Sequence, residues 1–232
     1  MRWAYCPPKS RTSIPSLVCP MRCVRRDRYL SVARRPRNMD WLRTVKDDLL
    51  KAAIVKIRQE DRVYEYIVNP LSSGVPEIPS EALWGCGYEV ARILDLKGAE
   101  KIMSPEAMGF HIAAALSMVT GLPLLMIRKR PYFLPGEVKV VKRTGYEESA
   151  MYINGVRKGD RVVLVDSLIA TGGTLIPIIK ALLDLGVVVQ DAAAVIERKG
   201  MGGVQAVERE TGVRVKTLLK VDLVDGKVRL EA

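Results

Sequence analysis

The sequence predicts an α/β fold in which a mainly parallel sheet is covered by helices on both faces. Short apolar runs rich in Val and Ile, such as Val162–Val165 and Val187–Ile196, are typical of strands buried on both sides. Segments long enough to form helices separate most of these runs, as the crossovers between parallel strands require. Ligands in such sheets bind beyond the carboxyl ends of the strands, so a functional site is expected there.

The first half of the predicted domain begins with a helix from Met39 to about Ile54, because its apolar residues recur at helical spacing. The alternating segment Tyr64–Val68 predicts a strand that ends at Asn69-Pro70. The next elements are expected to be a loop at Ser72–Pro79, a helix at Ser80–Leu96, a strand at Lys101–Met103, a helix at Ala107–Thr120, a strand at Leu124–Arg128 and a hairpin arm made of Val138–Lys142 and Met151–Ile153.

The second half follows the same alternation. The strand that ends at Asp166 is expected to lead into a helix that runs to Leu185, with Pro177 tolerated because it lies in the first turn. The last elements are expected to be a strand at Val187–Ile196, a short helix at Val204–Arg209, and strands at Val213–Val221 and Val228–Leu230.

Charge divides the chain into residues 1–38 and a domain at 39–232. The net charge is +11, but residues 1–38 contain ten Lys or Arg against one acid, Asp27, so the domain itself is close to neutral. This basic extension is rich in Pro, carries three of the four cysteines and lacks apolar periodicity, so it is not expected to fold. The favoured interpretation is that translation starts at Met39; a basic arm that binds nucleic acid is the alternative.

One stretch predicts a phosphate site. Arg161–Asp166 reads as a buried strand ending in an acid, and Ala170-Thr-Gly-Gly-Thr174 reads as a tight loop before a helix. Gly172 and Gly173 let backbone N–H groups approach a ligand, the loop hydroxyls add donors, and Thr174 can cap the helix. A helix N-terminus suits an anion, so Asp166 would face the hydroxyls of a sugar whose phosphate lies in the loop.

This stretch resembles the diphosphoribosyl-binding motif of type I phosphoribosyltransferases, except that Ser167 stands where the family has a second acid. The resemblance implies the family's fold, with a small hood and a flexible β-arm that acts as a lid. It also implies that loop residues Ala170, Thr171, Gly172, Gly173 and Thr174 bind the 5′-phosphate, that Asp166 and Ser167 bind the ribose, and that Asp166, Lys142 and Tyr146 serve catalysis.

Two further segments fit the same site. The turn Glu106-Ala107-Met108-Gly109 resembles the pyrophosphate loop of purine phosphoribosyltransferases. The basic run Arg128-Lys129-Arg130, followed by Leu134–Val138, is similar to archaeal hypoxanthine phosphoribosyltransferases, as are Thr144–Tyr146 and Tyr152–Gly155. The resemblance therefore implies that the turn, Arg128 and Lys129 bind the pyrophosphate of the substrate, which needs cations.

The choice of base is predicted to depend on Lys199, which follows the Val187–Ile196 strand. Hypoxanthine and guanine present an acceptor at position 6, and a lysine offers only donors. The predicted activity is therefore purine salvage with hypoxanthine or guanine favoured. Adenine specificity remains an alternative, and a regulator that senses phosphoribosyl diphosphate without catalysis is another, because Ser167 removes a charge that would face a cationic transition state.

The resemblance also implies Mg²⁺, bound mainly through the diphosphoribosyl substrate and without a confident protein ligand. The expected partners are the two small-molecule substrates and a second copy of the chain in a homodimer. Neither a membrane nor, for the domain, a nucleic acid is expected. A single cysteine in the domain, Cys86, suits a reducing compartment, and the cytoplasm is the expected location.

Overall fold

The computed structural model describes residues 40–59, 62–143 and 148–231. The extension at 1–38 and Tyr146 lie outside the described residues, so the predictions made for them stay predictions.

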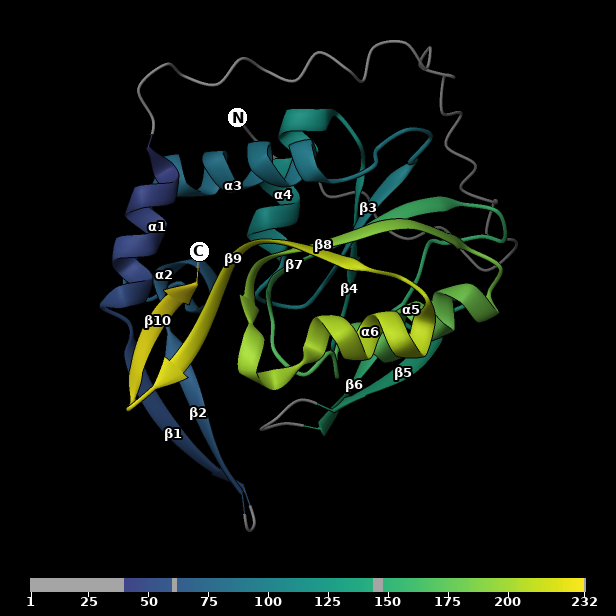
Figure 1. Cartoon of the computed structure of the whole chain (residues 1–232). Coiled ribbons are helices and arrows are strands. Elements are labelled where there is room, and N and C mark those ends of the chain that lie inside the picture. The colour runs from purple at the N-terminus through teal and green to yellow at the C-terminus, as the bar shows by residue number, and fades with distance from the viewer. Residues whose placement is uncertain (1–39, 60–61, 144–147, 232) are drawn as a thin grey trace, which may run out of the picture.

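A six-stranded sheet forms the centre of the molecule, in the order β10-β9-β8-β7-β3-β4 (Figure 1). The five neighbouring strands β4, β3, β7, β8 and β9 run parallel, and β10 is antiparallel to β9 at one edge. The predicted α/β class with a mainly parallel sheet is therefore confirmed. The sheet strands are β3 (Lys101–Pro105), β4 (Leu124–Ile127), β7 (Arg161–Ile169), β8 (Val188–Arg198), β9 (Val215–Val224) and β10 (Lys227–Glu231).

Helices cover both faces of this sheet. They are α1 (Trp41–Leu50), α2 (Pro70–Ser73), α3 (Ser80–Ile93), α4 (Phe110–Thr120), α5 (Leu175–Asp184) and α6 (Gly203–Thr211). Alternate residues of β7 belong to different cores: Val163 and Val165 pack with α1, α3 and α4, whereas Val162 and Leu164 pack with α5 and α6. This alternation explains why the strand reads as a continuous apolar run, since both of its faces are buried.

Two hairpins project from the layers. The hood hairpin, β1 (Ala53–Gln59) with β2 (Arg62–Val68), follows α1, and the arm hairpin pairs β5 (Val138–Arg143) with β6 (Glu148–Ile153) (Figure 1). The arm is anchored by Val140, Met151 and Ile153, which are buried in the core that includes α5. The predicted hairpin arm is thus confirmed as a secondary-structure element.

Several predicted boundaries were wrong, among them the start of the loop predicted at Ser72–Pro79, because Ser72 and Ser73 belong to α2. The first helix ends at Leu50 instead of Ile54, because Ile54 and the following residues pair with β2 in the hood. The strand β7 continues past Asp166 to Ile169, because β8 extends to Arg198 and keeps pairing with it, as in Ile169↔Glu197. Asp166 therefore lies within the strand, three residues before its end.

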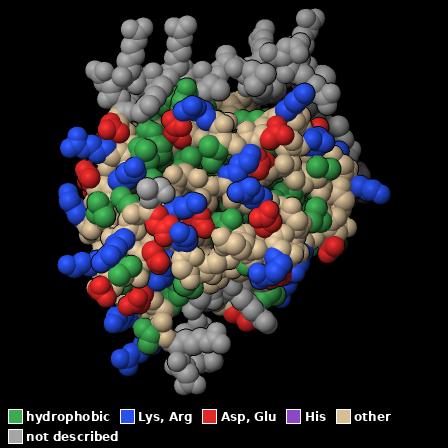
Figure 2. Space-filling view, viewed as in Figure 1, with side chains coloured by type: hydrophobic (Ala, Val, Ile, Leu, Met, Phe, Trp, Pro, Cys, Tyr) green, Lys and Arg blue, Asp and Glu red, His purple; other side chains and the backbone are tan. Residues whose placement is uncertain are grey.

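Charges of both signs are interspersed over the face of the described residues seen in Figure 2. This distribution agrees with the near neutrality of residues 39–232. Among the described residues, no helix has the length and apolar character that crossing a bilayer requires.

Candidate active site

The loop predicted to bind the 5′-phosphate, Ala170–Thr174, is called the phosphate loop below. It connects β7 to α5 at the carboxyl edge of the sheet. Gly172 has a φ of +80°, and a Cβ there would lie 3.0 Å from Val207 Cγ2. Only glycine suits this combination of left-handed backbone and close packing. The Gly173 N–H donates to Thr171 Oγ1 at 3.3 Å. Thr174 occupies the N-cap of α5, but its side chain makes no capping hydrogen bond to any described residue.

A residue that the sequence reasoning missed supports the loop from behind. Gly203, the first residue of α6, is buried, and a Cβ added to it would collide with the carbonyl oxygen of Ala170 and lie 2.8 Å from the Gly172 nitrogen. The start of α6 therefore contacts the loop backbone directly. The Gly202-Gly203 pair in the sequence was the available indication, since adjacent glycines often mark close backbone approach.

Asp166 is only 8% exposed, and burial raises the pKa of its carboxyl to about 7. Two groups act in the opposite direction. The Ser167 N–H donates to Asp166 Oδ1 at 2.7 Å, and the ammonium group of Lys142 lowers the pKa of Asp166 by its charge. The structure thus brings together a buried carboxyl and a cation from the arm, at the position predicted to face the ribose.

Ser167 is fully buried, and among the described residues its Oγ has no hydrogen-bond partner. A buried hydroxyl without a partner costs free energy. The contact of Ser167 with ribose stays a prediction.

The turn predicted to bind pyrophosphate, Glu106–Gly109, is called the pyrophosphate loop below. It lies between β3 and α4 as predicted. The Glu106 carboxylate accepts from Arg128 Nε at 3.0 Å and from the Lys129 N–H at 2.8 Å. These bonds, the one from Lys129 first, lower the pKa of Glu106 although partial burial opposes them. Residues predicted to share one subsite from two separate segments are thus in contact.

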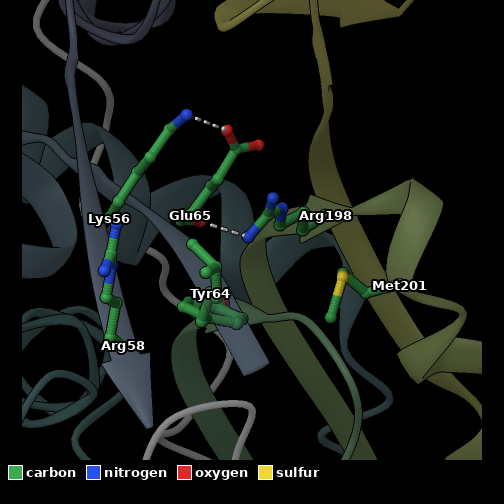
Figure 3. A pocket seen from close by; sticks show the side chains of 7 residues that line it. Lys56, Arg58, Tyr64, Glu65, Arg198 and Met201 are labelled. Atoms are coloured by element: carbon green, nitrogen blue, oxygen red, sulfur yellow. Dashed lines mark hydrogen bonds and ion pairs between the residues drawn. The ribbon is translucent and has the colours of Figure 1, made fainter. Parts of the chain in front are cut away.

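The phosphate loop opens into a cavity that also borders the hood and the pyrophosphate loop. Its wall includes Tyr64 and Tyr66 of β2, Met108 of the pyrophosphate loop and residues 168–175. Tyr64 also lines a second cavity of about 550 Å³, which is drawn in Figure 3. The remaining residues of that second wall are Lys56, Arg58, Val63, Glu65, Arg198 and Met201.

Arg198, at the end of β8, is the buried cation of this region. It is 8% exposed, its Nη1 donates to the Glu65 carbonyl at 2.5 Å, and its guanidinium lies 5.1 Å from the centre of the Tyr64 ring (Figure 3). Lys199, predicted to contact the base, is the first residue of the one-turn helix η2 (Lys199–Met201). Its side chain is half exposed and pairs with Glu231 on β10, which raises its pKa.

The chain matches the family model "Phosphoribosyl transferase domain" over residues 94–211. A hypoxanthine/guanine phosphoribosyltransferase of Methanocaldococcus infernus is 43% identical over 184 residues, which cover 79% of this chain and 97% of the relative. Its counterpart from Methanosarcina barkeri is 44% identical over 190 residues, covering 82% of this chain and 96% of the relative.

Solved structures agree on the fold. An adenine phosphoribosyltransferase from Thermoanaerobacter pseudethanolicus superimposes with a TM-score of 0.58 at 25% identity, covering 77% of this chain and 99% of the other. The adenine enzyme of Trypanosoma brucei, solved with AMP, pyrophosphate and ribose-5-phosphate, gives 0.62 at 19% identity and covers 80% and 82% of the two chains. From the family match, the identity to these relatives and the shared fold, this chain belongs to the type I phosphoribosyltransferase family.

Proposed function

We propose that this protein transfers the phosphoribosyl group of 5-phosphoribosyl 1-diphosphate to hypoxanthine or guanine in purine salvage. The products are the nucleoside 5′-monophosphate and diphosphate. The names of the archaeal relatives, at 41–44% identity, support this choice of base. The observation that carries it is the position of Arg198, a buried cation whose aromatic neighbour Tyr64 also borders the phosphate-loop cavity.

Arg198 fits the recognition of a 6-oxopurine for a chemical reason. A guanidinium has five N–H donors and no acceptor, and the hydrogen bond to the Glu65 carbonyl engages only Nη1. The remaining donors can bind a 6-oxo group, whereas the 6-amino group of adenine would oppose donor to donor. We therefore assign base recognition to Arg198 rather than to the half-exposed Lys199.

The other residues divide the substrate among them. The N–H groups of Ala170–Thr174 hold the 5′-phosphate, and Asp166 and Ser167 bind the ribose hydroxyls. The N–H groups of Glu106–Gly109, with Arg128 and Lys129, hold the diphosphate. As the C1–O bond loosens, positive charge develops at C1, and the ionised carboxylate of Asp166 stabilises it. Lys142 and Tyr146 of the arm complete the closed site.

The residues present fit a Mg²⁺ ion that is held mainly by the substrate and only in small part by the protein. Within the described ranges, no group of three or more His, Cys, Asp or Glu side chains is placed to hold a metal ion. Mg²⁺ usually keeps few protein ligands and takes the rest from phosphates and water, and Asp166 is the carboxylate that would face it. When bound through the substrate, the ion neutralises the charge of the leaving diphosphate.

The same proposal includes a homodimer that works in the cytoplasm. The loop at 128–137 presents Phe133, which is 86% exposed at a φ of +56°, flanked by the half-exposed Tyr132 and Leu134. Glu137 fixes this loop by accepting from the Tyr132 and Phe133 N–H groups. Such an ordered, exposed apolar loop supports contact with a second copy. The free thiol of buried Cys86 suits a reducing compartment.

Turnover with phosphoribosyl diphosphate, Mg²⁺ and one base at a time tests the proposal, with diphosphate release as the readout. Hypoxanthine and guanine should react, and adenine should react at least tenfold more slowly in kcat/KM. Turnover of adenine alone would keep the reaction but refute the assigned base. The absence of turnover with hypoxanthine, guanine, xanthine and adenine would refute the enzymatic proposal.

A further inference from the structure

The side chain of Tyr66 connects the hood strand β2 to the pyrophosphate loop. The hydroxyl of Tyr66 donates to Sδ of Met108 at 3.2 Å, across 42 positions of sequence, and lies 3.3 Å from Ser73 Oγ. Met108 is the third residue of the loop whose N–H groups are proposed to hold the diphosphate. A thioether sulfur is a weak acceptor, so this contact can orient the loop without locking it.

The same stretch of β2 is tied to the base end of the sheet. Arg198 donates to the Glu65 carbonyl at 2.5 Å and lies over the Tyr64 ring. Three consecutive residues, 64–66, therefore connect the end of β8 with the pyrophosphate loop. Tyr64 and Tyr66 also line the same cavity beside Met108, as side chains two positions apart on one strand face do.

We propose that Tyr66 is a positioning residue that couples the base subsite to the diphosphate subsite. The inference rests on the proposed function. A base bound beside Arg198 restrains β2, the restrained strand holds the Tyr66 hydroxyl against Met108, and Met108 fixes the N–H groups that receive the diphosphate. Coupling between two ligands is reciprocal, so bound phosphoribosyl diphosphate tightens base binding by the same factor.

Calorimetric titration measures this coupling directly. The dissociation constant of phosphoribosyl diphosphate with Mg²⁺ is determined with and without the 9-deaza analogue of the base that the wild type turns over. Carbon at position 9 prevents the transfer, so both ligands stay intact. The wild type should bind phosphoribosyl diphosphate at least fivefold more tightly when the analogue is present, within the usual range for coupled sites.

Tyr66→Phe keeps the ring and removes the hydroxyl. In this variant the coupling factor should fall about threefold, whereas the affinity for the analogue alone should change less than twofold. Met108→Leu removes the acceptor at similar volume and should lower the coupling factor by the same amount. Combining Tyr66→Phe with Met108→Leu should lower the coupling factor no further than either change alone. Ser73→Ala removes a different neighbour of the hydroxyl, Ser73 Oγ, and should leave the coupling unchanged.

Three results would overturn the inference while leaving the enzymatic activity intact. They are a wild type without coupling, a Tyr66→Phe variant with the wild-type coupling factor, and a Ser73→Ala variant that loses coupling as strongly as Tyr66→Phe. Failure of the wild type to bind phosphoribosyl diphosphate or to turn over a base would instead refute the proposed function, and the inference with it.

Discussion

Lys142 on β5 and Asp166 on β7 interact across the site: the lysine's charge lowers the pKa of a carboxyl that burial raises to about 7. Both side chains are buried, at 6% and 8% exposure. The arm hairpin is thereby linked electrostatically to the strand that carries the proposed ribose ligand. The charge state of Asp166 consequently depends on pH in the neutral range.

Asp166→Asn should stabilise the protein without ligand in a pH-dependent manner. The folded-state pKa lies above the ordinary 3.8, so ionisation opposes folding. This cost is absent below about pH 4, grows as the pH rises to about 7 and is constant above that. The gain at pH 8 should be about 2–4 kcal/mol, measured by urea unfolding at pH 4 and pH 8. Asp184→Asn, on the exposed end of α5, is the control. An equal gain at both pH values would contradict the assignment.

The rate should follow the same ionisation. Because the ionised carboxylate is proposed to stabilise charge at C1, kcat/KM of the wild type should rise as the pH passes through about 7. Asp166→Asn should reduce kcat by about 10²–10³-fold and abolish that rise. A flat profile in the wild type would show that another group controls the rate.

Arg198 and Lys199 form a matched pair of adjacent cations. Arg198→Gln should lower kcat/KM for hypoxanthine and guanine by about 10–100-fold and weaken the preference over adenine, because a charged donor is lost. Lys199→Gln should change kcat/KM less than threefold, since Lys199 is half exposed and pairs with Glu231. A larger loss in Lys199→Gln than in Arg198→Gln would assign recognition of the base to Lys199. Circular dichroism checks that both variants fold.

Gly203→Ala should weaken the binding of phosphoribosyl diphosphate. The added Cβ collides with the Ala170 carbonyl and forces the phosphate loop to move. KM for phosphoribosyl diphosphate should rise at least tenfold, with a smaller change in KM for the base. Gln205→Ala, at an exposed position of the same helix, is the control. An unchanged KM in Gly203→Ala would mean that the loop tolerates the shift.

Phe133→Asp should convert the proposed dimer to monomer, because a charge replaces the most exposed apolar side chain of the 128–137 loop. Sedimentation velocity at micromolar protein measures the mass. Met118→Asp changes a side chain of similar exposure on α4 and should leave the mass unchanged. A monomeric wild type would refute the dimer.

The fold was predictable where the residues of a single helix or strand show the periodicity of that element. The strand, loop and helix around Asp166 were read from apolar runs and glycines, and most other elements were placed within a few residues. The end of α1 was missed because Ala53 and Ile54 continue a helical stripe, and only pairing with β2 makes them a strand.

The site was less predictable because its contacts are non-local. The strand predicted to end at Ile196 continues to Arg198, which lies on the wall of the second cavity. The contact of Lys199 with the base stays a prediction. The contact of Tyr66 with Met108 joins segments 42 positions apart, and local sequence gives no indication of it. Gly203 had a local indication, but its partner Ala170 did not.

The contact of Gly203 with Ala170 also limits how this protein can be re-engineered. The five-residue phosphate loop is not a portable module, because its shape is completed by a helix that begins 29 positions after the loop ends. Grafting Ala170–Thr174 onto another α/β scaffold would transfer the sequence of the loop but not the start of α6, against which the loop packs. A chimera should therefore exchange the loop and the start of α6 together, so that the contact between them is kept.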